Sequence, residues 1–333
     1  MPIPIILGGL ALSMAGYGAK KGYDAYEDND TADKYNKRAK NIYDEATDKL
    51  LTSREKTNQN FKNIGKLKAS IYEDTLGDFV EIFSNIKNVD FEDNLNLGIN
   101  LPNDYQKMIE LKTSVLDIKE IIGGGLAALG GGAAAGFGAF GSVGLLATAS
   151  TGTAIGGLSG IAATNATLAW LGGGSIATGG GGIALGTTIL GGIAFAPILA
   201  VGGAIFAAKA EEAKFNSYAN FDKAEASAKE MEVTTIVLKE ISTRIEEFAN
   251  ILKPLDEIFE DYIEKMEDIV DESNDYSKYS DDNKKVILIT VSIAQTIKNI
   301  CDAPIIDEEG KVTRKSKRVI KKAKKFILKL EEV

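Results

Sequence analysis

The longest charge-free segment of the chain, residues 121–208, most constrains what this protein can fold into. It contains 88 residues without a charged side chain and 26 of the 35 glycines of the 333-residue chain. A transmembrane helix needs roughly 20 apolar residues, so this segment is far longer than an ordinary buried helix. Small residues also let helices approach one another closely within a membrane. The pattern therefore predicts that residues 121–208 form a glycine-rich, helical transmembrane region.

Two long, highly charged segments with helical periodicity flank this region. Apolar or small residues recur at spacings of three and four through residues 28–88, which we expect to form one long helix, and again through residues 209–272. Such stripes are typical of helices that pack on partner helices, and only six prolines interrupt the chain, so we expect an all-α fold. Because the two segments bracket one membrane region, we expect them to pack as long antiparallel, coiled-coil-like stalks. Pro254 should kink or break the second of them.

Shorter helices and breaks complete the polar part of the chain. Asn, Asp, Gly and Pro mark a loop at residues 89–104, and residues 105–122 resume a helical pattern. Residues 273–283 form a polar break before a helix at residues 284–300, in which ILITVSIA should be the buried face. Residues 314–330 are predicted as a basic final helix.

The N-terminus predicts a membrane anchor. Residues 2–19 are uncharged, and Lys20 and Lys21 follow them, whereas nothing basic precedes them as a secretory signal requires. The positive-inside rule then places residue 20 onward in the cytoplasm. A buried or interfacial helix is the alternative for this short run. We divide the chain into an apolar anchor at 1–22, a first cytoplasmic stalk at 23–120, the glycine-rich transmembrane region at 121–208, a second stalk at 209–282, and C-terminal helices with a basic tail at 283–333.

The transmembrane region separates into three apolar blocks, at about 121–147, 154–171 and 183–208. Lysines flank both of its ends, so both ends prefer the cytoplasm and the number of crossings should be even. We expect two crossings around a re-entrant middle, with four short crossings as the alternative. The most polar cluster inside it gives the candidate pore lining, Thr164, Asn165 and Thr167, whose side chains could instead bond between helices. The candidate helix-packing glycines are Gly132, Gly136, Gly152, Gly156, Gly160, Gly182 and Gly186.

The composition excludes several classes of active site. The chain has no histidine and one cysteine, Cys301, so histidine triads, the usual Cys/His metal sites and an internal disulfide are excluded. Gly136, Gly138 and Gly141 match the dinucleotide pattern GxGxxG. No strand precedes that match, however, and no acidic residue follows about 20 positions later. We therefore expect no catalytic residue, no metal and no cofactor, and an enzyme is not expected.

The charge is unevenly distributed. The formal net charge is −9, yet residues 254–282 carry twelve acids and two lysines, whereas residues 283–329 carry thirteen basic residues and four acids. The basic tail could lie on anionic lipid headgroups, bind nucleic-acid phosphates or dock on the acidic residues 256–272. The candidate phosphate-binding residues are Arg314, Lys315, Arg318, Lys321, Lys322, Lys324 and Lys325.

Three stretches carry a resemblance to a known family. They are the opening run that ends GYGAKKGYDAY, the stalk phrase NIYDEATDKL with LGDFVEIFSNIKNV, and the block ATNATLAWLGGGSIATGGGGIALGTTILGGIA. The chain resembles the membrane effector of the Hailong bacterial antiphage defence system over nearly its whole length. The resemblance implies an oligomeric ion channel in the bacterial inner membrane, most simply a tetramer. It further implies a partner nucleotidyltransferase whose short single-stranded DNA product binds the channel and keeps it closed.

The residues alone leave three functions open. The first is a gated channel that depolarises the cell, in which a shift in stalk packing moves the glycine-rich helices. The second is an α-helical pore-forming toxin that hides its glycine-rich hairpin and then inserts it. The third is a non-conducting membrane scaffold, for which Asn165→Ala would have no effect and no current would be seen.

Overall fold

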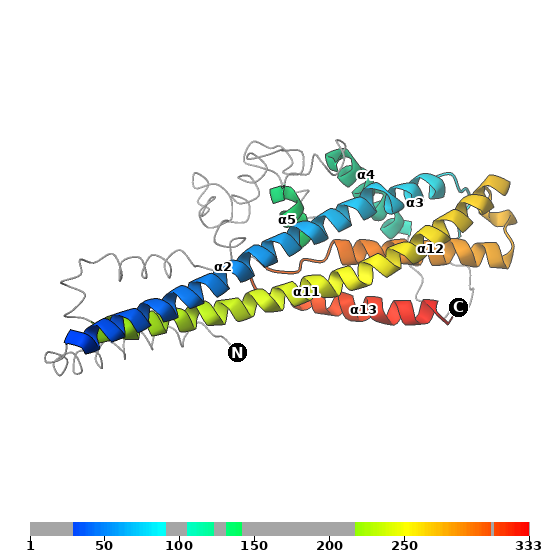
Figure 1. Cartoon of the computed structure of the whole chain (residues 1–333). Coiled ribbons are helices and arrows are strands. Elements are labelled where there is room, and N and C mark those ends of the chain that lie inside the picture. The colour runs from blue at the N-terminus through cyan, green and yellow to red at the C-terminus, as the bar shows by residue number, and fades with distance from the viewer. Residues whose placement is uncertain (1–28, 91–104, 123–130, 142–216, 308–309, 333) are drawn as a thin grey trace. The chain divides into compact units, whose positions relative to one another are not determined.

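The computed structural model describes residues 29–90, 105–122, 131–141, 217–307 and 310–332 (Figure 1). All regular elements within these ranges are helices, which confirms the predicted all-α class. The predicted anchor at 1–22 and most of the predicted transmembrane region lie outside the described residues. Among the helices that are described, none combines the length and the apolar character needed to cross a bilayer.

The first stalk is a long helix followed by a short one. Helix α2 runs over Asn29–Glu73 and α3 over Thr75–Phe83, so the prediction of one helix across residues 28–88 is wrong beyond residue 73. Asp74 leaves the helical conformation, with φ −91° and ψ −93°. Its carboxylate accepts a hydrogen bond from the Ser70 hydroxyl at 3.0 Å. Local side-chain bonds of this kind compete with a regular helix.

The second stalk, α11, is one helix over Ser217–Glu272. It continues through Pro254, so of the predicted kink or break, the break does not occur. Its buried face follows a heptad repeat, the spacing that keeps one apolar seam facing a partner helix. The residues at intervals of seven are at most 3% exposed: Ala224, Met231, Leu238, Ile245, Leu252, Phe259 and Met266.

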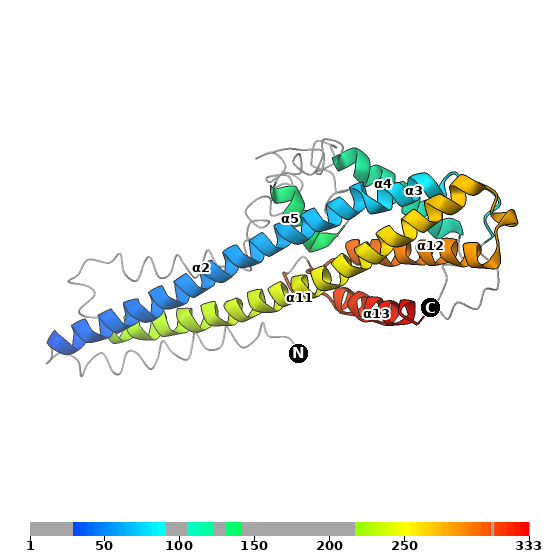
Figure 2. The ribbon, with the colours of Figure 1, turned by 45° about the vertical axis from the view of Figure 1, so that its right-hand side comes forward.

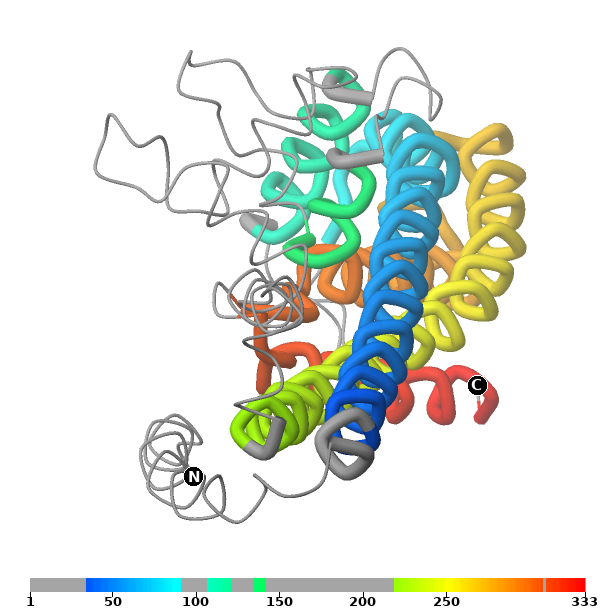
Figure 3. The backbone as a smooth tube through the Cα atoms, turned by 60° about the vertical axis from the view of Figure 1, so that its left-hand side comes forward, coloured from blue at the N-terminus to red at the C-terminus, as the bar shows by residue number. Residues whose placement is uncertain are grey.

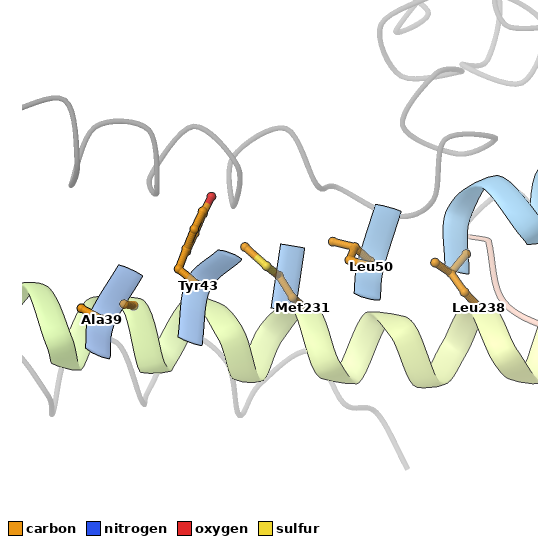
Figure 4. Packing of buried hydrophobic residues seen from close by; sticks show 6 residues of the cluster. Ala39, Tyr43, Leu50, Met231 and Leu238 are labelled. Carbon is orange, nitrogen blue, oxygen red and sulfur yellow. The ribbon is translucent and has the colours of Figure 1, made fainter. Parts of the chain in front are cut away.

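The described chain divides into two compact units, and the boundary falls inside both long helices. The first unit holds α2 up to Lys56 and α11 up to Lys239. Here the rings of Tyr35 and Phe221 meet edge to face at 5.6 Å, and the Thr47 hydroxyl lies 3.5 Å from the Met231 sulfur. The cluster between the helices is apolar (Figure 4) and consists of Ala39, Tyr43, Leu50, Ala224, Met231 and Leu238.

The second unit begins at Thr57 and Glu240 and contains all the shorter helices. The Thr57 and Ser242 hydroxyls are hydrogen-bonded at 2.9 Å, and Thr75 donates to Asp256 at 2.7 Å. Further along both helices, the rings of Phe79 and Phe259 lie 5.7 Å apart.

In each unit, residue numbers therefore rise together along α2 and α11. The two stalks run parallel, and the prediction of antiparallel stalks is wrong. The physical reason is that an apolar seam can pack on a partner helix running in either direction, so the spacing of the apolar residues does not set the direction.

The returning chain forms α4 (Tyr105–Ile122) and α5 (Gly131–Phe140). Helix α4 packs on α3, and α5 contacts α2, with Ala134 next to Gly65 and Gly138 next to Phe61. The predicted helix at residues 105–122 is confirmed. The described helix α5 has ten residues, fewer than the roughly 20 of a membrane span.

The remaining helices complete the second unit. After the 3₁₀ turn η4 (Tyr276–Lys278), α12 covers Asp281–Cys301 and α13 covers Arg314–Leu330. Ser280 caps α12, which therefore begins three residues before the predicted start, and residues 287–294 are buried on every side as expected of ILITVSIA. Within this unit, α4 and α5 lie on one side of α12 and α13 lies on the other (Figures 2 and 3).

Candidate functional site

Helix α13 presents an exposed cationic face. Its start is fixed by Thr313, whose hydroxyl accepts a hydrogen bond from the Ser316 amide at 3.0 Å. All seven predicted phosphate-binding residues are exposed, and Lys317, which the prediction omitted, is exposed beside them. We call this set the basic face: Arg314, Lys315, Lys317, Arg318, Lys321, Lys322, Lys324 and Lys325. From Arg314 to Lys325 the face extends for about 16 Å along the helix.

The apolar side of α13 is already used for packing. Ser316, Ile320, Ala323 and Leu330 are at most 9% exposed, and α13 packs against α12. An amphipathic helix that lies in a membrane buries this kind of side among the lipid chains. Here most of this side is buried or half-buried within the protein, and Leu328 is the exposed large apolar residue of α13, at 61%. Charge is therefore the main attraction that the basic face offers to an anionic partner.

Docking on the acidic stalk is the predicted internal alternative for these cations. It requires ion pairs between the basic face and residues 256–272. The ion pairs that the structure gives within the described ranges do not join these two segments. Within the described ranges, the internal docking alternative is therefore not supported by an ion pair.

A second site lies where α5 meets α2. Glycines allow the two backbones to touch: a Cβ atom built on Gly65 would lie 2.6 Å from the Ala134 carbonyl carbon, and one built on Gly138 would lie 3.0 Å from that of Phe61. Ordinary carbon contacts are 3.5–4.0 Å. Residues 134–140 are buried at this contact. The docked helix therefore depends on two positions without side chains.

The last carbonyl groups of α5 bind donors from other elements. Helix C-termini leave carbonyls without an intrahelical partner. The Lys68 amine lies 3.5 Å from the Phe137 oxygen and 3.3 Å from the Gly138 oxygen. The Ile305 amide donates to the Ala139 oxygen at 2.7 Å. These donors from α2 and from the segment after α12 replace the water that a free helix end would bind.

Lys68 is fully buried at this contact, which is unusual for a lysine. Its amine lies 5.7 Å from the ring centroid of Phe137 and 5.5 Å from that of Phe248, within cation–π range. Burial lowers the pKa of Lys68 to about 8, against the smaller opposing effects of Cys301 and Asp302. The negative end of the α5 dipole favours the charged amine at this position.

Asp302 holds the neighbouring part of the network. Its carboxylate accepts a hydrogen bond from the Tyr72 hydroxyl at 2.7 Å and another from the Lys298 amine at 2.6 Å. Burial, followed by the Asp302 charge, raises the pKa of Tyr72 well above its ordinary value. Burial likewise raises the pKa of the Cys301 thiol. Both groups are therefore neutral at physiological pH, and Cys301 is not a reactive thiolate.

The structure places only some of the predicted site residues. Gly132 and Gly136 lie in α5, and Gly136 is buried, but the closest described backbone contact is made by Gly138. The pore-lining candidates Thr164, Asn165 and Thr167 lie outside the described residues. The packing candidates Gly152, Gly156, Gly160, Gly182 and Gly186 also lie outside them.

Sequence reasoning missed Gly65, Lys68, Tyr72 and Asp302. One signal was present, because Lys68 follows Ile64 by four positions and precedes Ile71 by three, which puts a charge on the apolar stripe. A glycine inside a polar helix, as at Gly65, was a second signal. Tyr72 and Asp302 are 230 positions apart, so no local pattern links them.

Comparison with known proteins gives no match to a protein-family model, to a curated protein or to a solved structure. Within the described ranges, no group of three or more cysteine, aspartate or glutamate side chains is arranged to hold a metal ion. The basic face and the docked α5 are therefore the two features of the molecule from which a function can be inferred.

Proposed function

We propose that this protein is an oligomeric, gated membrane channel that depolarises the bacterial inner membrane as the effector of Hailong antiphage defence. In this proposal, short single-stranded DNA made by a partner nucleotidyltransferase binds the basic face and holds the channel closed. A tetramer is the assembly that the family resemblance implies. Thr164, Asn165 and Thr167 are the proposed pore lining.

The observation that carries the proposal is the basic face itself. It combines eight exposed cations on one helix with no described ion pair to the acidic stalk. Clustered Lys and Arg bind phosphates by releasing counterions, which needs no base-specific contact. The one aromatic residue of α13, Phe326, is half-buried, so base stacking is not supported and recognition should follow charge and length.

The same geometry favours a soluble polyanion over a lipid surface. Stable membrane anchoring by a helix combines buried apolar side chains with attraction to anionic lipid. Because Ile320, Ala323 and Leu330 of α13 are already buried, the electrostatic contribution is the larger one that remains. A short DNA strand can follow the curved face of the helix, whereas a flat bilayer meets only part of it.

A second candidate function is favoured by the packing of α5. This helix belongs to the charge-free stretch, yet its residues 134–140 are buried against polar helices of the second unit. A pore-forming toxin would store an inserting segment in this way. The two candidates differ in behaviour: a toxin is soluble and monomeric without detergent, whereas the effector is purified as an oligomer from membranes.

The experiment is ion flux from liposomes that contain the purified full chain, with and without a short single-stranded DNA. The test variant replaces Lys321, Lys322, Lys324 and Lys325 with glutamine. The proposal predicts flux that DNA suppresses in the wild type and at least tenfold weaker suppression in the variant. Flux without any DNA effect would overturn the proposed control, and inserted protein without flux would overturn the channel.

A charge-matched control separates a local effect from a general one. Lys66, Lys112, Lys223 and Lys253 are exposed lysines on other helices. Replacing these four with glutamine changes the net charge by the same amount. DNA should still suppress the flux of this control, because the basic face is intact.

A further inference from the structure

Residues 302–306, which directly follow α12, contact both the start of α13 and the end of α5. We call them the α12–α13 link. The Thr313 amide donates to the Ile305 oxygen at 2.9 Å, and the Thr313 hydroxyl donates to the Pro304 oxygen at 2.6 Å. Thr313 is also the N-cap of α13. The start of the basic helix is therefore fixed to the link.

The link also contacts the last turn of α5. The Ile305 amide donates to the Ala139 oxygen at 2.7 Å, and the Ile306 amide lies 3.4 Å from the same oxygen. Gly141 follows α5 with φ +68°, and a Cβ atom there would lie 2.6 Å from the Asp302 carbonyl carbon. The α5 terminus and the link are thus in direct backbone contact.

Tyr72 and Lys298 hold the link against the helical body. Both bind the carboxylate of Asp302, the first residue of the link, at 2.7 Å and 2.6 Å. The link residues Ala303, Ile305 and Ile306 are at most 2% exposed. Packed interiors transmit a shift to their neighbours instead of absorbing it. A buried segment whose residue Ile305 bonds both to the start of α13 and to the end of α5 is suited to coupling two sites.

We infer that the α12–α13 link transmits occupancy of the basic face to α5, so that a polyanion on α13 stabilises the docked form of α5. The inference rests on the proposed function and names its route of regulation. Coupling between sites is reciprocal, so a change at the α5 terminus must also alter binding at α13. Typical couplings change affinity 5- to 150-fold, and we expect about tenfold here.

The test uses hydrogen exchange on the full chain, with and without a short single-stranded DNA. DNA should slow exchange of the Gly141 and Ile305 amides about tenfold. In Tyr72→Phe, which removes only the hydroxyl bond to Asp302, DNA should bind with wild-type affinity but no longer slow exchange at Gly141. Protection confined to α13 in the wild type, or unchanged protection at Gly141 in Tyr72→Phe, would overturn the coupling.

The control for Tyr72→Phe is Tyr279→Phe. The Tyr279 hydroxyl donates to the Ser273 oxygen at 2.6 Å in the turn between α11 and α12, away from the link. This variant should keep the wild-type response to DNA. A loss of protection at Gly141 equal to that of Tyr72→Phe would show a nonspecific effect and contradict the assigned route.

A ligand-free arm keeps the coupling testable if DNA does not bind. Gly141→Ala introduces a side chain at positive φ and against Asp302, so it should loosen the link. We expect exchange of the Ser316 amide, in the first turn of α13, to rise at least fivefold without any DNA. Unchanged exchange at Ser316, with increased exchange in α5, would overturn the coupling. Failure of DNA binding alone would contradict only the proposed ligand.

Discussion

Gly65→Ala tests whether the docking of α5 depends on backbone contact with α2. The added methyl group would lie 2.6 Å from the Ala134 carbonyl carbon and 3.0 Å from the Gly138 nitrogen. Both neighbours are backbone atoms, so they cannot rotate away. Restoring an ordinary contact moves α5 by roughly 1 Å.

The expected cost follows from the side chains that α5 buries. Phe137 is fully buried and Phe140 is 6% exposed, and burial of two such rings is worth about 3–6 kcal/mol. A gap of 0.5–1 Å forfeits about a quarter to a half of the contact energy, or roughly 1–3 kcal/mol. Alanine stabilises α2 itself by about 1 kcal/mol relative to glycine, but this gain does not hold α5 in place.

The assay is native-state hydrogen exchange of the amides of residues 131–141. Where these amides exchange only after α5 undocks, a loss of about 1.4 kcal/mol in docking free energy makes exchange about tenfold faster. We therefore expect five- to hundredfold faster exchange in Gly65→Ala. Gly77→Ala is the matched control, since its methyl group would meet the flexible end of the Lys119 side chain, with the Lys119 Cδ at 3.1 Å. Wild-type exchange in Gly65→Ala, or an equal increase in Gly77→Ala, would refute the reasoning.

Three further predictions follow from charge and capping. Because the pKa of Lys68 is lowered to about 8 from 10.5, the unfolded chain binds a proton that the folded chain lacks between these pH values, so the contribution of Lys68 to stability rises with pH. Between pH 7 and 10, the unfolding free energy of the wild type, measured by chemical denaturation, should rise by about 2–3 kcal/mol relative to that of Lys68→Met. Both proteins share the alkaline loss of stability from Cys301 and Tyr72, so the comparison cancels it. A difference between the two proteins that does not change with pH would contradict the buried amine. Thr313→Ala, which removes the N-cap of α13, should cost about 1 kcal/mol of unfolding free energy, whereas Thr113→Ala at an exposed position of α4 should cost less than about 0.5 kcal/mol. The glutamine variant of Lys321, Lys322, Lys324 and Lys325 should reduce the salt dependence of single-stranded DNA binding by up to about 3 in log–log slope, and an unchanged slope would exclude these lysines from the contact.

The helices could be predicted well because periodicity and caps are local. The bounds of α4 and α13 agree with the prediction at both ends, and the buried run of α12 was identified from its apolar residues. The interruption at Asp74 was missed because a single residue outside the helical conformation does not change the spacing of the apolar residues along α2 and α3. The break expected at Pro254 does not occur. A proline removes one backbone hydrogen bond from a long helix, and the burial of Leu252 and Leu255 can offset that loss of stability.

The relative direction of the stalks could not be predicted from the pattern. A seam of residues at spacings of three and four faces a partner equally well in either direction. The antiparallel prediction depended on an assumed membrane topology. The parallel direction is shown by contacts between distant parts of the chain, which no local pattern reveals. These contacts are Tyr35–Phe221 in the first unit and Thr57–Ser242 and Thr75–Asp256 in the second.

The candidate site was predictable only where it is a property of one helix. The basic face follows from the positions of Lys and Arg on α13 and needs no partner to be recognised. The docking site of α5 arises from α2, α5 and the α12–α13 link together. Gly138 was noticed only within GxGxxG, and nothing local shows that it lies against Phe61.

The most direct test of a DNA-controlled channel is the current through a planar bilayer that contains the purified full chain. The account predicts discrete current steps without DNA, closure when a short single-stranded DNA is added on the side of the basic face, and recovery after a nuclease removes it. Inserted protein that never conducts, or a current that the DNA leaves unchanged, would contradict the account.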